Sequence, residues 1–95
     1  MSRVTIRIPM PLRGYTQGAG EVQVQASSVR EALQALGAAH DGVLARLLEP
    51  EGELRQFVNV FVGSRNVRSL DGLSTPLSDG DVVAIVPAVA GGRTP

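Results

Sequence analysis

The chain has 95 residues, enough for one small domain, and its nine arginines balance nine acidic residues to give a formal net charge of zero. A neutral chain argues against electrostatic binding to nucleic acid or to anionic membranes. Cysteine and lysine are absent and His40 is the one histidine, which excludes disulfides, thiol nucleophiles, lysine Schiff bases and multi-histidine metal sites. Because there is no apolar run of about 18 residues and no signal-peptide pattern, we expect a cytoplasmic protein. We also expect it to be no enzyme and to bind no cofactor or metal of its own.

The first third of the chain predicts a β-hairpin. Residues 3–8 alternate apolar and polar side chains, and residues 21–25 repeat this alternation, so each segment predicts a strand with one buried face. Two prolines and three glycines lie between the two segments, and we therefore expect residues 9–20 to form a loop.

Two helices are predicted next. Ser28 and Glu31 have the spacing of a capping box, and apolar residues then recur at helical spacing as far as Gly37. Asp41 is expected to cap a short second helix, whose apolar positions lie within residues 43–48.

The second half of the chain predicts strands. Residues 56–62 are rich in β-branched and aromatic side chains, and residues 82–86 form an apolar run between a turn signal at 79–81 and Pro87. Residues 67–68 are expected to start a short return strand after a glycine turn.

This order of elements predicts an α+β fold of the β-grasp, or ubiquitin-like, type. We expect a mixed sheet of four or five strands, with the first and last strands parallel at its centre. One main helix and a short second helix would cover one face. Residues 1–87 would form this domain, and residues 88–95 a flexible C-terminal tail.

The sheet face without helices is predicted to carry an apolar patch with basic residues beside it. Period-two alternation directs seven such side chains outward: Phe57, Phe61, Val82, Ala84, Val86, Arg3 and Arg7. We interpret the patch as a docking surface for a partner protein, with Arg65 and Arg68 as further candidate contacts. The alternatives are that long side chains cover the patch or that the register is wrong by one residue.

The tail contains a glycine pair shortly after the predicted last strand. Ala90, Gly91 and Gly92 have little or no side chain, so a partner enzyme can close around their backbone and reach a carboxylate on Gly92. The simpler alternative is a flexible end without such a role.

Several segments resemble the MoaD/ThiS family of ubiquitin-like sulfur carriers, and within it the CysO-type carriers. Residues 79–81 and 86–92 are typical of the whole family, and residues 48–50 and 57–62 point to the CysO branch. The resemblance implies a carrier rather than a catalyst. An E1-like adenylyltransferase of the MoeB/ThiF type would adenylate Gly92, using ATP and a metal that belong to that enzyme. A sulfur donor would then form a thiocarboxylate, which would supply a sulfur-acceptor synthase making cysteine or another metabolite.

The sequence departs from the family pattern beyond Gly92, where residues 93–95 follow the glycine pair. While they remain, Gly92 has no free carboxylate. We therefore expect cleavage between Gly92 and Arg93, which a JAMM-type zinc metalloprotease performs in some relatives. Three alternatives stay open: a small subunit of molybdopterin synthase, a ubiquitin-like protein modifier, and a β-grasp binding module with a passive tail.

Overall fold

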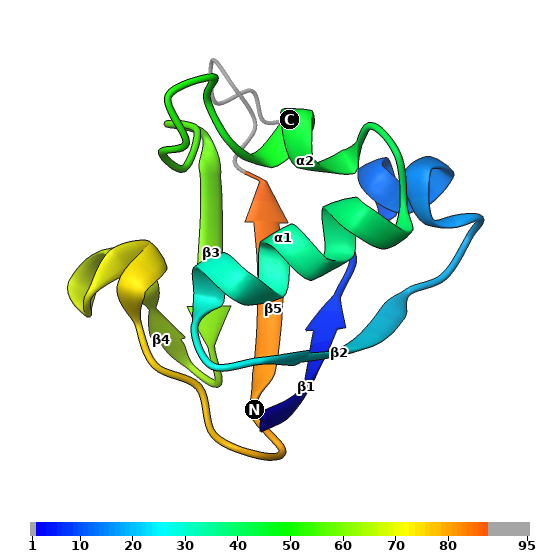
Figure 1. The fold of residues 1–95 in the computed structure, drawn as a ribbon. Coiled ribbons are helices and arrows are strands. Elements are labelled where there is room, and N and C mark those ends of the chain that lie inside the picture. The colour runs from blue at the N-terminus through cyan, green and yellow to red at the C-terminus, as the bar shows by residue number, and fades with distance from the viewer. Residues whose placement is uncertain (1, 88–95) are drawn as a thin grey trace.

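Strand β1, Ser2–Arg7, lies inside a five-stranded sheet in the computed structural model, which describes residues 2–87 (Figure 1). The strand order is β2-β1-β5-β3-β4, with β2 at Glu21–Ala26, β3 at Val58–Val62, β4 at Arg65–Asn66 and β5 at Val82–Pro87. β1 and β5 are parallel neighbours, and the other pairings are antiparallel. This is the predicted β-grasp topology, with the first and last strands side by side.

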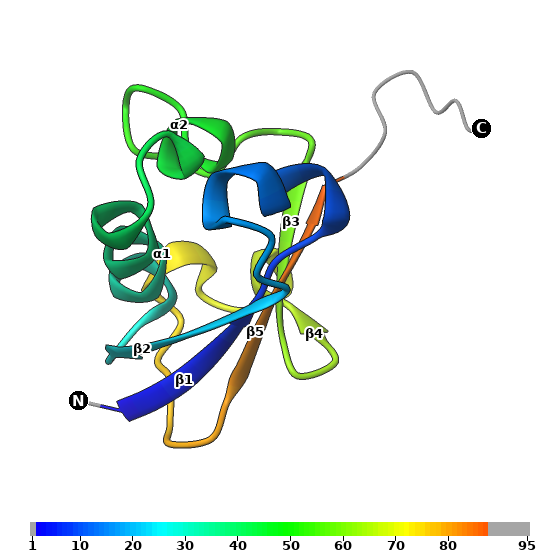
Figure 2. The same ribbon diagram turned by 90° about the vertical axis from the view of Figure 1, so that its right-hand side faces the viewer.

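The main helices lie on one side of this sheet (Figure 2). Helix α1 spans Val29–Ala39 and α2 spans Val43–Leu47. The predicted capping box is confirmed, because the amide of Glu31 donates to Ser28 Oγ at 3.3 Å and the Glu31 carboxylate accepts from the amide of Ser27 at 2.8 Å. Helices and strands share one core, whose largest fully buried side chains are Ile6, Ile8, Leu33, Leu36 and Leu47.

The segment between β1 and β2 is helical, and the prediction of a loop there was wrong. Met10–Thr16 form η1, a 3₁₀ helix with Pro11 in its first turn, where a proline sacrifices no helical hydrogen bond. Leu12 and Thr16 are buried, and the Thr16 hydroxyl donates to the carbonyl of Ala19 at 2.9 Å. Pro11 therefore begins a helical turn instead of breaking one.

Two further predicted boundaries were wrong for local reasons. Gly42, not Asp41, is the N-cap of α2, and its φ of 89° is one that glycine adopts far more readily than aspartate. β3 begins at Val58, because residues 56 and 57 form a turn, so Phe57 lies just before the strand.

The short return strand β4 lies two residues earlier than predicted. Val67–Ser69 instead form a second 3₁₀ turn, η2, which the Asn66 side chain caps by accepting from the amide of Arg68 at 2.9 Å. A third, η3, spans Gly72–Ser74.

Within residues 2–87, no helix has the length and apolar character needed to cross a membrane.

Helices α1 and α2 meet at Gly37. A Cβ atom placed on Gly37 would lie 2.9 Å from Leu44 Cβ, closer than packed carbon atoms normally approach. The missing side chain therefore allows the two helices to touch.

We expect Gly37→Ala to lower the melting temperature, although alanine favours an isolated helix by about 1 kcal/mol over glycine. The added methyl group would overpack the contact with Leu44, at a cost of about 1–3 kcal/mol. Gly14→Ala in η1 is the matched control, because a Cβ there meets nothing within 4 Å. A melting temperature for Gly37→Ala equal to or above that of the parent chain would contradict the close helix contact.

Candidate functional site

The sheet face opposite the helices holds the apolar side chains that alternation directs there. Phe61 pairs with Ala84 across β3 and β5, and Val86 pairs with Asn59, so all four lie on one face. Phe57, Val86 and Val82 are 51%, 44% and 36% exposed. We call the surface of the following four residues the open face: Phe61, Val82, Ala84 and Val86. Phe57 is exposed in the turn directly before β3 and lies outside this ladder.

The two arginines predicted beside the open face lie at opposite ends of β1. Arg7 pairs with Ala84 and so extends the row that contains Phe61. Its guanidinium is 4.0 Å from the Glu21 carboxylate, and side-chain exposures of 65% and 63% make this a weak ion pair. The amide of Arg3 donates to Asp79 at the other end of the strand. Arg7, rather than Arg3, therefore lies near the end of β5 from which the tail departs.

A groove of about 670 Å³ lies at the carboxyl ends of β1 and β5. Its lining combines charged and apolar side chains, among them Arg7, Pro9, Arg13, Glu21, Ala84 and Val86. Arg13 Nε donates to the carbonyl of Ile8 at 3.0 Å, and the guanidinium packs so closely on Gly20 that a Cβ there would lie 3.2 Å from it. A guanidinium held beside an apolar strip suits an acidic side chain on a partner protein.

Arg13 was not among the site residues predicted from the sequence. The reason is that residues 9–20 were expected to be a loop, in which the direction of a side chain is undefined. Pro11 was the available signal, because proline is common in the first turn of a helix. A predicted helix would have given the Arg13 side chain a defined direction.

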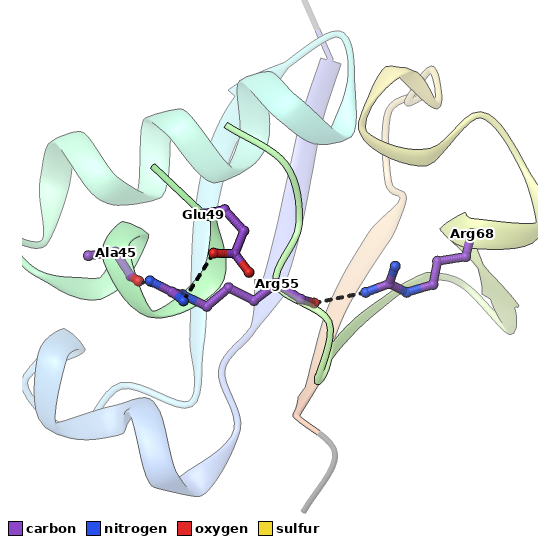
Figure 3. Close-up of polar contacts among 4 residues, drawn as sticks. All are labelled: Ala45, Glu49, Arg55 and Arg68. Atoms are coloured by element: carbon purple, nitrogen blue, oxygen red, sulfur yellow. Dashed lines mark hydrogen bonds and ion pairs between the residues drawn. The ribbon is translucent and has the colours of Figure 1, made fainter. Parts of the chain in front are cut away.

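Arg68 holds the chain on both sides of Phe57. Its Nη2 donates to the carbonyls of Arg55 and Val58, each at 2.8 Å. Arg55 in turn donates to the carbonyl of Ala45 at 2.9 Å and pairs with Glu49 at 3.4 Å, which connects this turn to α2 (Figure 3). Arg68 therefore fixes the turn that contains Phe57, directly before β3, a role that differs from the partner contact considered from the sequence.

Other predicted features have ordinary structural roles or lie outside the described residues. Asp79 and Asp81 form the turn before β5, where the Asp81 carboxylate accepts from the amide of Ser78 at 2.8 Å. Among residues 2–87, no three acidic or histidine side chains gather as a metal site would require. Ala90, Gly91, Gly92 and Arg93 lie outside the described residues.

The β-grasp sheet, its single layer of main helices and its exposed apolar face define a ubiquitin-like protein. The ThiS family model matches residues 6–92, and the chain belongs to the ThiS family. Members of this family are sulfur carriers and not catalysts.

Known relatives agree with this assignment. The chain is 41% identical over 91 residues to the sulfur carrier protein CysO of Mycobacterium tuberculosis, covering 94% of this chain and 98% of the relative. It is 46% identical over 66 residues to small archaeal modifier protein 3 of Haloferax volcanii, covering 70% and 71%. A chain of the Amycolatopsis orientalis BexX/CysO complex superimposes with a TM-score of 0.88 at 40% identity, covering 94% of this chain and 99% of that one. The protein is a sulfur carrier of the CysO/ThiS type.

We expect Arg68→Ala to reduce the free energy of unfolding by about 1–2 kcal/mol, because two backbone carbonyls lose a charged donor. For a domain of this size, each kcal/mol corresponds to a fall in melting temperature of about 4–8 °C. Arg65→Ala is the control, because its side chain makes no polar contact with the rest of residues 2–87. Amide hydrogen exchange should also accelerate around Phe57 in Arg68→Ala alone. Unchanged melting and exchange would show that Arg68 does not support this turn.

Proposed function

We propose that the chain carries sulfur as a thiocarboxylate on Gly92. The observation that carries this proposal is the family match, which extends through residue 92 and so includes both glycines of the tail. A carboxylate is a poor electrophile until it bears a good leaving group. An E1-like adenylyltransferase of the MoeB/ThiF type would transfer AMP from ATP to Gly92 and release pyrophosphate. A sulfur donor would then displace AMP, with ATP and metal held by the activating enzyme throughout.

The position of β5 supports this role. Its last residue, Pro87, pairs with Val58, so the chain leaves a central strand beside the open face and the groove. Five residues separate Pro87 from the end of Gly92, and at about 3.3 Å per residue they can span up to roughly 17 Å. We infer that the open face, with Arg7 and Arg13, docks on the partner while Ala90, Gly91 and Gly92 enter its active site.

Residues 93–95 require a maturation step before activation. We propose that a JAMM-type zinc metalloprotease cleaves between Gly92 and Arg93. Gly91 and Ala90 support this proposal, because a narrow active site can close around residues with little or no side chain.

The sulfur is proposed to pass to an acceptor synthase that makes cysteine or another sulfur-containing metabolite. Similarity to CysO over 94% of the chain favours this acceptor class over molybdopterin synthase. The solved BexX/CysO complex supports docking of a folded partner protein, since a CysO-type carrier there assembles with a second protein.

A second candidate function is protein modification through Gly92. The similarity to small archaeal modifier protein 3 favours it. Because this chain has no lysine, its own side chains offer no amine on which a polymeric chain of modifiers could be built. Conjugates detected in cells as single additions to other proteins would support this candidate.

We expect a chain ending at Gly92 to exchange one oxygen for sulfur when it is incubated with the activating enzyme, ATP and sulfide. Intact-mass spectrometry would detect the product, and a chain ending at Gly91 is the matched control. The 95-residue chain should remain unlabelled until a protease removes residues 93–95. Thiocarboxylate on a chain that still carries these residues would contradict the proposed maturation.

We expect Val86→Asp to slow thiocarboxylate formation by about tenfold or more at limiting carrier concentration. A carboxylate in an apolar docking patch would have to be buried without a partner. Gln34→Asp makes a matching change on the exposed surface of α1, on the opposite side of the sheet, and should leave the rate unchanged. Both variants should first be shown to melt as folded proteins. Equal rates for the two variants would exclude docking through the open face.

A further inference from the structure

The outer edge of β2 is a free pairing surface within the described chain. β2 is the terminal strand of the sheet, with β1 as its one neighbour. The amide of Ile8 donates to the carbonyl of Gly20 at 2.8 Å, so these two residues form a hydrogen-bonded pair. In an antiparallel ladder, residue pairs that exchange backbone hydrogen bonds alternate with pairs that do not. This alternation directs the backbone groups of Glu21, Gln23 and Gln25 away from β1, toward the free edge.

This edge carries few of the features that usually prevent strand addition, because its one charged side chain is Glu21 at the start of β2. Natural edge strands are protected by lysine, proline, bulges or covering segments. β2 contains neither lysine nor proline, and all six of its residues pair with β1 in one uninterrupted register. The formal net charge of zero also means that copies of the chain do not repel one another strongly.

We propose that β2 pairs with β2 of a second copy of this chain, antiparallel and centred on Gln23. Gln23 would face Gln23 of the second copy, and Glu21 would face Gln25 of the second copy. These are the residues whose backbone groups point outward, so the pairing uses all of them. Val22 would then lie opposite Val24 of the second copy, on the side that faces the helices.

The side chains near this edge also suit a second copy. Glu21 would lie opposite a neutral glutamine rather than another acid, so no like charges oppose each other. Gly37 contacts Leu44 of α2, and residues two positions away lie on nearly the opposite side of a helix. Ala35 and Ala39 therefore face away from α2.

The proposed dimer is weak and leaves the open face accessible. Two six-residue strands bury less than the roughly 1,200–2,000 Å² of a standard stable interface, so the dimer should form reversibly as concentration rises. β1 separates β2 from β5, so the open face is accessible in the dimer, whereas Glu21 on the wall of the groove lies at the seam between the copies. The proposal is independent of the sulfur chemistry at Gly92.

Analytical ultracentrifugation of the whole chain over a concentration series tests the proposal. The parent chain should shift from monomer to dimer. Gln23→Pro removes an amide that points outward and leaves the β1 ladder intact, so it should weaken the dimer by about tenfold or more. Gln23→Thr keeps the amide and should dimerise like the parent.

A second pair of variants applies if the proline variant fails to fold. Gln25→Glu places an acid opposite Glu21 of the second copy and should weaken the dimer, whereas Gln25→Arg should strengthen it, most clearly at low salt. A parent chain that stays monomeric at its highest attainable concentration would overturn the proposal. So would a dimer that neither Gln23→Pro nor the Gln25 variants alter, because its interface would lie elsewhere.

Discussion

The parallel pairing of β1 with β5 is the constraint on which the rest of the structure depends. The amide of Arg3 donates to Asp79 Oδ1 at 2.8 Å across 76 residues of sequence, and the amide of Thr5 donates to the carbonyl of Asp81 at 3.0 Å. Because parallel strands end at the same edge of a sheet, this pairing brings η1 beside the end of β5. The groove, Arg7 and Arg13 consequently lie where the chain leaves the sheet toward its glycine pair.

A single helical layer on this sheet has a second consequence. α1 and α2 cover one face of the sheet (Figure 2), and Val82 and Val86 on the other face stay in contact with water. Exposed apolar area of this kind is unfavourable in a monomer and favourable once a partner covers it. A sulfur carrier of the CysO/ThiS type must meet other proteins to be loaded and unloaded, so such a face is compatible with its function. The chain has no cysteine or lysine, so no thiol or lysine amine of its own could attack the C-terminus if it were activated as proposed.

Arginine side chains that donate to backbone carbonyls hold the turn directly before β3. Arg68 donates to carbonyls on either side of Phe57, and Arg55 connects the same turn to α2. Phe57 lies outside any strand, so its position depends on these arginines and not on a β-ladder. Substitution of Arg55 or Arg68 is therefore expected to move Phe57.

Local patterns in the sequence determined the strands, the capped helix, the turn before β5 and the face on which Phe61, Ala84 and Val86 lie. These features follow from two-residue and 3.6-residue periods, which depend on neighbours in the chain. Only the tertiary structure showed that Leu12 of Met10–Thr16 is buried and that Arg68 donates to the carbonyls of Arg55 and Val58. The physical reason is that burial of Leu12 and donation to distant carbonyls depend on contacts between elements, which no local pattern encodes.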